Sequence, residues 1–157
     1  MRSIVKDFLK SQNWQYSEIE GKSLILFGIN GENGNFQCIA DIIEETSEFI
    51  FFSICGSNVP IEKRSEIIEL LNQINFRILL GNFVMDPEDG EIRFRTSVNY
   101  NSITPSIKFV ENIIMPNIIT VDSCLPAIMG ILFSNISISD ALKLIEGEII
   151  FRGEDPA

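Results

Sequence analysis

The segment from Pro105 to about residue 134 limits the possible folds more than any other part of the chain. Its apolar residues recur at helical spacing and form two stripes along one predicted helix. The first stripe consists of Ile107, Val110, Ile114, Ile118, Val121, Leu125, Ile128 and Leu132, and the second of Met115, Ile119, Met129 and Phe133. A helix that is apolar on more than one side is usually buried on more than one side. We therefore expect a long helix packed against the rest of the chain, with Pro116 and Pro126 kinking or dividing it.

Residues 113–133 are also long and apolar enough to cross a lipid bilayer. However, Asp122 lies near the middle of this stretch, where a carboxylate costs about 2.5–3.5 kcal/mol on membrane-insertion scales. Asn117 and the two prolines make a membrane span still less favourable. The N-terminal residues lack the apolar core of a secretory signal peptide. These features predict a buried helix in a cytoplasmic protein that has no membrane partner.

The remainder of the chain alternates between helical and strand-like patterns. The predicted elements are a helix at 2–13, a short strand or arm at 14–19, strands at 22–30, 35–44 and 48–55, a helix from Pro60 to about 78, strands at 81–86 and 91–98, the long helix, and a short helix at 138–146. Their order is α-β-β-β-α-β-β-α-α, which we interpret as a single domain over residues 1–147. The tail 148–157 is expected to be loosely ordered.

Two patterns predict which residues form the core. Residues 48–55 are apolar at both odd and even positions, which predicts a central strand covered on both faces, with Phe52 nearly fully buried. The second helix is expected to bury Ile61, Ile67, Ile68, Leu71, Ile74 and Ile78. Asn75 falls on the same face, and its amide is expected to bind the neighbouring backbone.

Charge and composition exclude several classes of function. The chain has 12 Lys and Arg against 22 Asp and Glu, a formal net charge of −10, which disfavours nucleic acid as a partner. It has no histidine, the commonest general base and metal ligand. Cys38, Cys55 and Cys124 lie far apart between apolar neighbours and cannot complete an ordinary zinc site. We therefore expect buried thiols, no metal, no cofactor, no catalytic residues and no enzymatic activity.

Two loops have superficial likeness to ligand sites. The glycines at 28, 31 and 34 suggest a phosphate loop, but they lack its Lys and Ser/Thr and lead into a strand, which favours a plain hairpin turn. Residues 86–90 suggest a calcium loop, but the glycine is fifth rather than sixth and Ser97 stands where a bidentate Glu is needed. A hairpin turn is again the better interpretation.

Arg93 and Arg95 alternate with Ile92, Phe94 and Thr96 along the predicted strand 91–98. The pattern is typical of a half-solvated strand near the edge of a sheet. Two guanidinium groups on an open face could bind a carboxylate, and the alternative is a solvated face that neutralises nearby acids.

Several longer segments carry a resemblance to a known family. They include "FIFFSICGSNVPIEKRSEIIELLNQIN", "GNFVMDPEDGEIRFRTSV" and the shorter "EGKS" and "NGENGNFQC". With the order of elements, they make the chain similar, from about residue 3 to 147, to the YbjN family of bacterial sensory transduction regulators, and most similar to its cyanobacterial members. Pro116 departs from the family pattern.

The resemblance implies an α+β fold like that of type III secretion chaperones: a curved antiparallel sheet of about five strands with helices packed on it. Proteins with that fold are often dimeric and bind extended segments of client proteins. It carries over no catalytic residue, because the shared segments are turns and strands.

From these observations we expect a protein-binding module, chaperone-like or regulatory, that acts as a homodimer and can take a protein or peptide client. The candidate contact residues are Met115, Ile119, Met129, Phe133, Arg93 and Arg95. The four on the long helix would otherwise expose an apolar stripe on the least charged part of the chain. The alternatives are a small-ligand sensor or signalling regulator with a pocket between the sheet and the long helix, and a structural or assembly factor.

Overall fold

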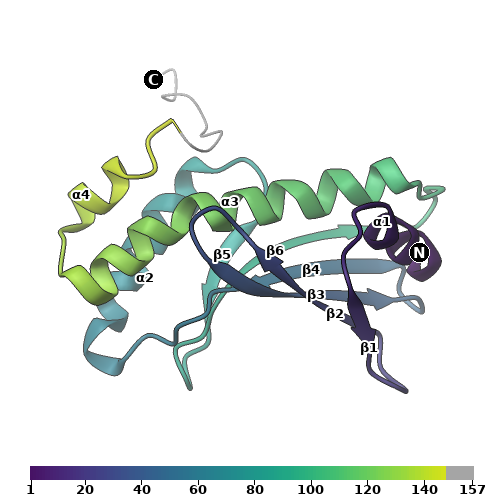
Figure 1. Cartoon of the computed structure of the whole chain (residues 1–157), viewed down its shortest axis with the longest axis horizontal. Coiled ribbons are helices and arrows are strands. Elements are labelled where there is room, and N and C mark those ends of the chain that lie inside the picture. The colour runs from purple at the N-terminus through teal and green to yellow at the C-terminus, as the bar shows by residue number, and fades with distance from the viewer. Residues whose placement is uncertain (148–157) are drawn as a thin grey trace.

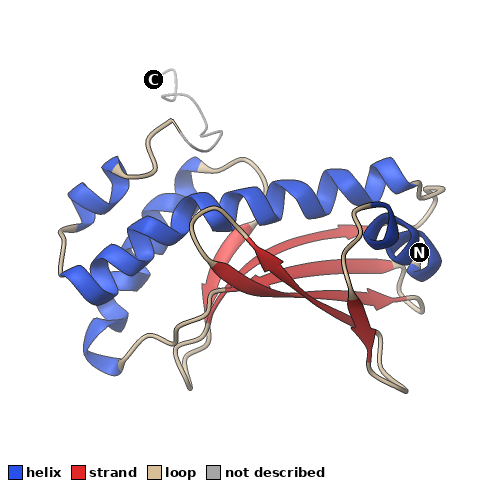
Figure 2. Ribbon diagram, viewed as in Figure 1, coloured by secondary structure: helices blue, strands red, loops and turns tan. Residues whose placement is uncertain are grey.

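The computed structural model describes residues 1–147 and has an α+β fold. Within these residues, six strands form one antiparallel sheet in the order β1-β2-β3-β4-β6-β5. Figures 1 and 2 show that the helices of this region all lie on one side of the curved sheet. The expected tail 148–157 lies outside the described residues.

The observed elements follow the predicted order. The helices are α1 (Arg2–Ser11), α2 (Arg64–Arg77), α3 (Ile107–Ser134) and α4 (Ile138–Lys143), with a short 3-10 turn, η1, at Ile61–Lys63 before α2. The strands are β1 (Tyr16–Glu18), β2 (Leu24–Asn30), β3 (Asn35–Ile43), β4 (Glu48–Ile54), β5 (Asn82–Met85) and β6 (Ile92–Asn99). The short arm expected at 14–19 contains a sixth strand, β1, beyond the five predicted.

The core lies between the sheet and the helices. Strands β2, β3, β4 and β6 bury alternate residues, as antiparallel strands with one covered face should. Phe27 and Phe51 stack with ring centroids 5.8 Å apart, and Trp14 stacks on the other side of Phe27 at 5.7 Å. Phe8 of α1 meets the edge of Trp14 at 5.9 Å, so these rings join α1 to the centre of the sheet.

Strand β4 is central, as predicted, because β3 and β6 flank it. The expectation that it is covered on both faces is wrong. Phe49, Phe51 and Ser53 are buried beneath the helices, whereas Ile50, Phe52 and Ile54 point to the opposite face and are only half-buried. The sequence of one strand cannot distinguish a second covering layer from an apolar face left open.

Helix α3 lies along the covered face of the sheet (Figure 1). Ser106 caps its first turn by accepting a hydrogen bond from the Phe109 N–H at 3.1 Å. The helix continues through Pro116 and Pro126, so the expectation that the prolines divide it is wrong. Pro116 frees the carbonyl of Asn112, an exposed residue, so water can bind that carbonyl without a break in the helix.

A buried polar cluster fixes α3 on the sheet. Asn117 is fully buried and donates to the carbonyl oxygens of Phe51 and Phe94, each at 3.2 Å, one on β4 and one on β6. Its side-chain oxygen accepts from the Ser53 hydroxyl at 2.7 Å, and it also donates to Thr96 at 3.1 Å. Because a buried amide needs specific partners, this cluster sets the position of α3 along its axis.

The segment predicted as the second helix, which forms η1 and α2, departs from the predicted burial at two positions, and Ile78 just after it is half-buried. Ile67, Leu70, Leu71 and Ile74 are buried, but Ile61 and Ile68 are 79% and 53% exposed. The prediction for Asn75 is confirmed: its amide donates to the Phe83 carbonyl at 3.0 Å and accepts from the Phe83 N–H at 2.7 Å. The side chain thus binds the outer edge of β5 at that residue.

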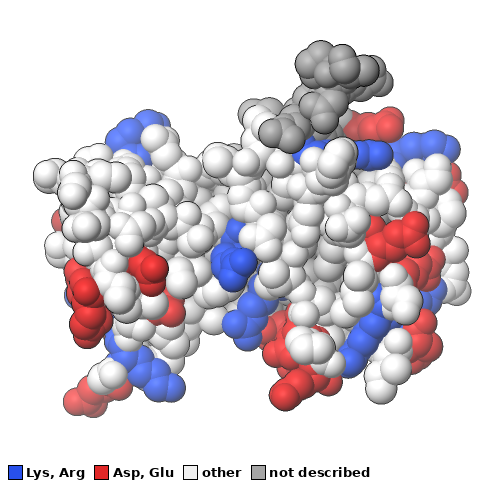
Figure 3. Space-filling model, turned by 180° about the vertical axis from the view of Figure 1, so that it is seen from behind, with Lys and Arg blue, Asp and Glu red and all other residues white. Residues whose placement is uncertain are grey.

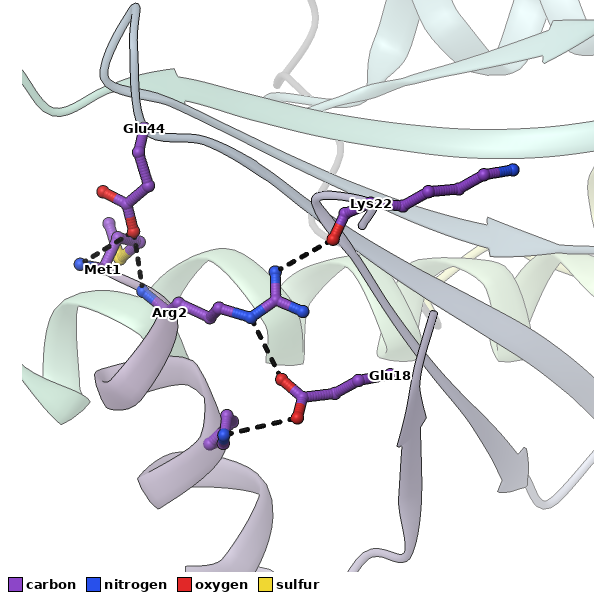
Figure 4. Close-up of polar contacts among 6 residues, drawn as sticks. Met1, Arg2, Glu18, Lys22 and Glu44 are labelled. Atoms are coloured by element: carbon purple, nitrogen blue, oxygen red, sulfur yellow. Dashed lines mark hydrogen bonds and ion pairs between the residues drawn. The ribbon is translucent and has the colours of Figure 1, made fainter. Parts of the chain in front are cut away.

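Ion pairs attach α1 to two parts of the sheet (Figure 4). Glu18 of β1 pairs with Arg2 at 3.0 Å and with Lys6 at 3.4 Å, and Glu44, in the turn after β3, accepts from the Arg2 backbone N–H at 3.3 Å. Partial burial alone would raise the pKa of Glu18, but the hydrogen bonds and charges of Arg2 and Lys6 outweigh it, and the pKa is lowered.

Candidate functional site

The side of the sheet away from the helices carries an apolar surface, which we call the open face. Its half-buried apolar residues are Leu24, Leu26, Ile39, Ile43, Ile50, Phe52, Ile54 and Val84. The pairing register places Leu26, Ile39 and Phe52 side by side on β2, β3 and β4. No helix of residues 1–147 covers this row (Figure 2).

Arg93 and Arg95 lie on the same face, on β6. Arg95 pairs with Phe52 across the β4–β6 ladder, so it ends the row of Leu26, Ile39 and Phe52. The guanidinium carbon of Arg93 lies 5.7 Å from the centre of the Phe52 ring, a cation–π contact. The structure therefore brings both predicted arginines onto one apolar surface.

The two arginines differ in how their charges are paired. Arg93 is half-buried and forms an ion pair with Glu91, which lies at the start of the same hairpin arm. Arg95 is exposed and forms no ion pair with any other residue of the range 1–147. Arg95 is thus available to a carboxylate from outside the described fold.

The other candidate contact residues lie on the opposite side of the sheet, on α3. Ile119 and Phe133 are exposed at 52% and 71%, while Met115 and Met129 are half-buried and pack against the core. The six candidate residues therefore do not form one surface. Whether the four on α3 contact a partner stays a prediction.

The cysteines are inert in this environment. Cys38, Cys55 and Cys124 are buried and free of disulfides, as predicted. Burial raises the pKa of each thiol to about 12, and the nearby Cys55 contributes to the shift at Cys124. A thiol with such a pKa is protonated at neutral pH and is a poor nucleophile.

The glycine loop between β2 and β3 is a hairpin turn, as predicted. The backbone N–H groups of Glu32 and Asn33 donate to the carboxylate of Asp122 on α3, at 3.0 and 2.9 Å. These are the groups that a phosphate would need, and a carboxylate already binds them. No local pattern indicates this contact, because Asp122 lies about ninety positions further along the chain.

The acidic loop after β5 is likewise a turn. Asp86 accepts from the Glu88 N–H at 2.8 Å, and Asp89 accepts from the Glu91 N–H at 2.9 Å, so each carboxylate binds its own backbone. In the part of the chain that the structure describes, no group of three Cys, Asp or Glu side chains is placed to hold a metal ion.

A comparison with protein-family models finds a match over the sheet-forming region. Residues 2–107 match the model of YbjN, whose description reads "Putative bacterial sensory transduction regulator". The chain belongs to the YbjN family. A comparison with curated proteins finds no significant match.

The matched YbjN region contains α1, α2 and the complete sheet, so it includes the open face with Arg93 and Arg95. Most of α3 lies beyond it. Within residues 1–147, α3 is the one helix long and apolar enough to cross a membrane, by length and composition only. The described fold uses it as a core helix, with Asn117 bound to the sheet.

Proposed function

We propose that this YbjN protein is a non-enzymatic regulatory or chaperone-like module that binds an extended segment of another protein on its open face. It acts in the cytoplasm and as a homodimer. One observation carries the proposal: an uncovered apolar row that ends at Arg95, whose charge has no ion-pair partner in residues 1–147.

The open face favours a protein segment over a small molecule. Leu26, Ile39 and Phe52 lie on three neighbouring strands and form a shallow surface rather than an enclosed cavity. Contiguous apolar surface of this kind often marks a protein contact. An extended chain can place alternate side chains on such a surface along its length.

The charged side chains on the open face indicate which residues the bound segment should contain. Arg95 and Arg93 lie beside apolar residues, so a segment with Leu, Ile or Phe near Asp or Glu fits the face best. The net charge of −10 repels acidic segments elsewhere on the protein, which makes Arg95, whose charge is not paired within residues 1–147, a selective point of attraction.

Two further observations support a binding role rather than catalysis. The family is described as one of regulators, and the three thiols have raised pKa values in buried sites. The space between α3 and the sheet, where a small-ligand sensor would need a pocket, is occupied by Asn117, Ile114 and Val121, all fully buried.

The test uses an array of synthetic peptides of about fifteen residues with varied apolar and charged content. We expect the wild type to prefer peptides that combine apolar residues with Asp or Glu. Arg95→Glu should weaken binding of the best peptide about tenfold, which corresponds to about 1.4 kcal/mol for one charge-assisted contact.

The matched control is Lys108→Glu, which changes the net charge equally at an exposed site on α3. It should leave the affinity nearly unchanged. Equal losses in both variants would mean that net charge alone governs binding, and a lack of preference among the peptides would contradict the proposal.

A further inference from the structure

A groove lies between α2 and the edge strand β5. Its volume is about 390 Å³, which falls within the range of small-ligand pockets. Ile68 and Leu71 of α2 and Phe83 and Met85 of β5 contribute its apolar lining. Val84, which alternates with the two β5 residues, belongs to the open face, so the groove and the open face lie on opposite sides of the sheet.

Hydrogen bonds hold α2 beside β5 at both ends of the groove. At one end, the Asn75 amide accepts from the Phe83 N–H at 2.7 Å and donates to the Phe83 carbonyl at 3.0 Å. At the other end, Arg64 donates through Nε to the Val59 carbonyl at 3.1 Å and through Nη1 to the Pro87 carbonyl at 2.9 Å. The walls are thus fixed before any ligand binds, which lowers the cost of binding.

Arg64 also brings a positive charge to the groove that no acidic side chain of residues 1–147 pairs with. The half-buried guanidinium binds only backbone carbonyls within this range, those of Val59, Pro87 and, at 3.4 Å, Glu88, and it forms no ion pair there. A guanidinium has five N–H donors, so these three bonds leave donors for a further acceptor. A carboxylate at this end of the groove would form charge-assisted hydrogen bonds with them.

The helical repeat of α2 orders these groups along the groove. Arg64, Ile68, Leu71 and Asn75 follow one another at spacings of four, three and four, so they lie on one face of the helix. The face has a charge at one end, two apolar side chains in the middle and an amide at the other end. Seven residues separate Arg64 from Leu71, which corresponds to about 10 Å along the helix axis, the length of an alkyl chain of about eight carbons.

We propose that this groove binds a small amphipathic carboxylate, a molecule with an unbranched alkyl chain of about eight carbons, whose carboxylate is bound by Arg64 and whose chain lies along the apolar lining. A small molecule fits better than a protein segment, because a stable protein contact buries about 800 Å² on each partner. The apolar part of the groove is only about 10 Å long. The site is separate from the open face, and its occupation does not depend on segment binding there.

The net charge of the protein makes the head group a sharp test. The chain carries a formal charge of −10, which attracts cations and repels anions over most of its surface. Figure 3, the view from behind, shows charged side chains gathered in patches with broad uncharged surface between them. A preference for a carboxylate over an amine on the same alkyl chain therefore requires a local positive group, and Arg64 is the one that lines the groove.

The first experiment is a methyl NMR titration of the full-length, isoleucine-labelled protein with octanoate below its micelle concentration. The signal of Ile68 should shift and saturate, whereas Ile61 and Ile119, which are exposed outside the groove, should change little. Octanoate should bind about tenfold more tightly than octylamine. Butanoate should bind more weakly than octanoate, because each buried CH₂ contributes about fourfold in affinity. No saturable change at Ile68, or equal affinity for octanoate and octylamine, would overturn the inference.

The second experiment measures the same affinities in variants by calorimetry. Arg64→Gln should weaken octanoate about tenfold and leave octan-1-ol unchanged, because the alcohol lacks the carboxylate. If Arg64 only held the walls of the groove together, both ligands would lose affinity equally, and that result would overturn the assigned contact. The control Lys108→Gln makes the same change in net charge at an exposed site on α3 and should affect neither ligand.

A second pair of variants tests the groove without altering Arg64. Ile68→Glu places a negative charge in the lining and should abolish octanoate binding, whereas Ile61→Glu makes the same change outside the groove and should not. Both side chains are exposed, so neither substitution disturbs the core. Equal effects of the two variants would overturn the site. Peptides of the array that shift the signal of Ile68 when octanoate does not would assign the groove to a protein segment and overturn the inference as well.

Discussion

A single residue, Asn117, explains how a long apolar helix is held on the sheet as a core helix. Its amide binds backbone carbonyls of β4 and β6 and the hydroxyl of Ser53, so every polar atom of the side chain has a partner. The residue could be recognised in the sequence as polar, but not as the contact that holds α3 on the sheet. Its partners lie 21 to 66 positions away, and only the tertiary fold brings them together.

The buried thiols predict how stability depends on pH. Burial raises the pKa of Cys38, Cys55 and Cys124 to about 12, above the value of about 8.5 in the unfolded chain. Between these values the unfolded state releases protons that the folded state retains. The stability that the buried protonated thiols contribute should therefore be fully present below about pH 8.5. Above that pH the free energy of unfolding should fall by about 1.4 kcal/mol per pH unit for each thiol.

Urea unfolding at several pH values between about 7 and 10 measures this slope. Replacing all three cysteines by Ala should flatten it over this range, whatever the effect of the substitutions at pH 7. A slope that persists unchanged in the triple variant would show that other groups cause the alkaline loss.

At the scale of elements, the strand and helix order was predictable because periodicity marks each element locally. The start of α4 is equally local, because the Ser137 hydroxyl accepts a hydrogen bond from the N–H of Asp140, three residues further on, at 3.1 Å. What the local pattern could not predict is which apolar residues stay exposed. Ile61, Ile68 and Phe52 have the same sequence signal as core residues, and their exposure depends on where the other elements lie.

Strand β4 offers a matched pair of adjacent phenylalanines that tests this distinction. Phe51 is fully buried beneath α3, and Phe52 is half-buried on the open face. Phe51→Ala should lower the free energy of unfolding by about 3–5 kcal/mol, the range for a core Phe. Phe52→Ala should cost about 1 kcal/mol, because its removal leaves no internal cavity.

Chemical denaturation of both variants under the same conditions measures the loss in the free energy of unfolding for each substitution. Similar losses for the two substitutions would mean that an additional layer covers the open face in solution. A homodimer with its interface away from the open face would leave both open faces uncovered, so dimer formation alone should not equalise the two values.

At the scale of the whole molecule, the arrangement of layers is what links the fold to the function. Helices cover one side of a six-stranded sheet in residues 1–147, and the other side keeps an apolar row with two arginines. The arginines and their alternation were visible in the sequence, as was the idea that they could bind a carboxylate. Their position beside Leu26, Ile39 and Phe52 was not visible in the sequence, because it depends on the pairing register of four strands.

The most direct test of binding at the open face is a methyl NMR titration of the isoleucine-labelled protein with the best peptide of the array. Ile39, Ile50 and Ile54 report on the open face, Ile67 and Ile114 on the core, and Ile119 on the exposed side of α3. If the segment binds on the open face, the peptide should shift or broaden the signals of Ile39, Ile50 and Ile54. The signals of Ile67, Ile114 and Ile119 should change little. Changes confined to Ile119, or to Ile68 on α2, with the open-face methyl signals unmoved, would contradict it.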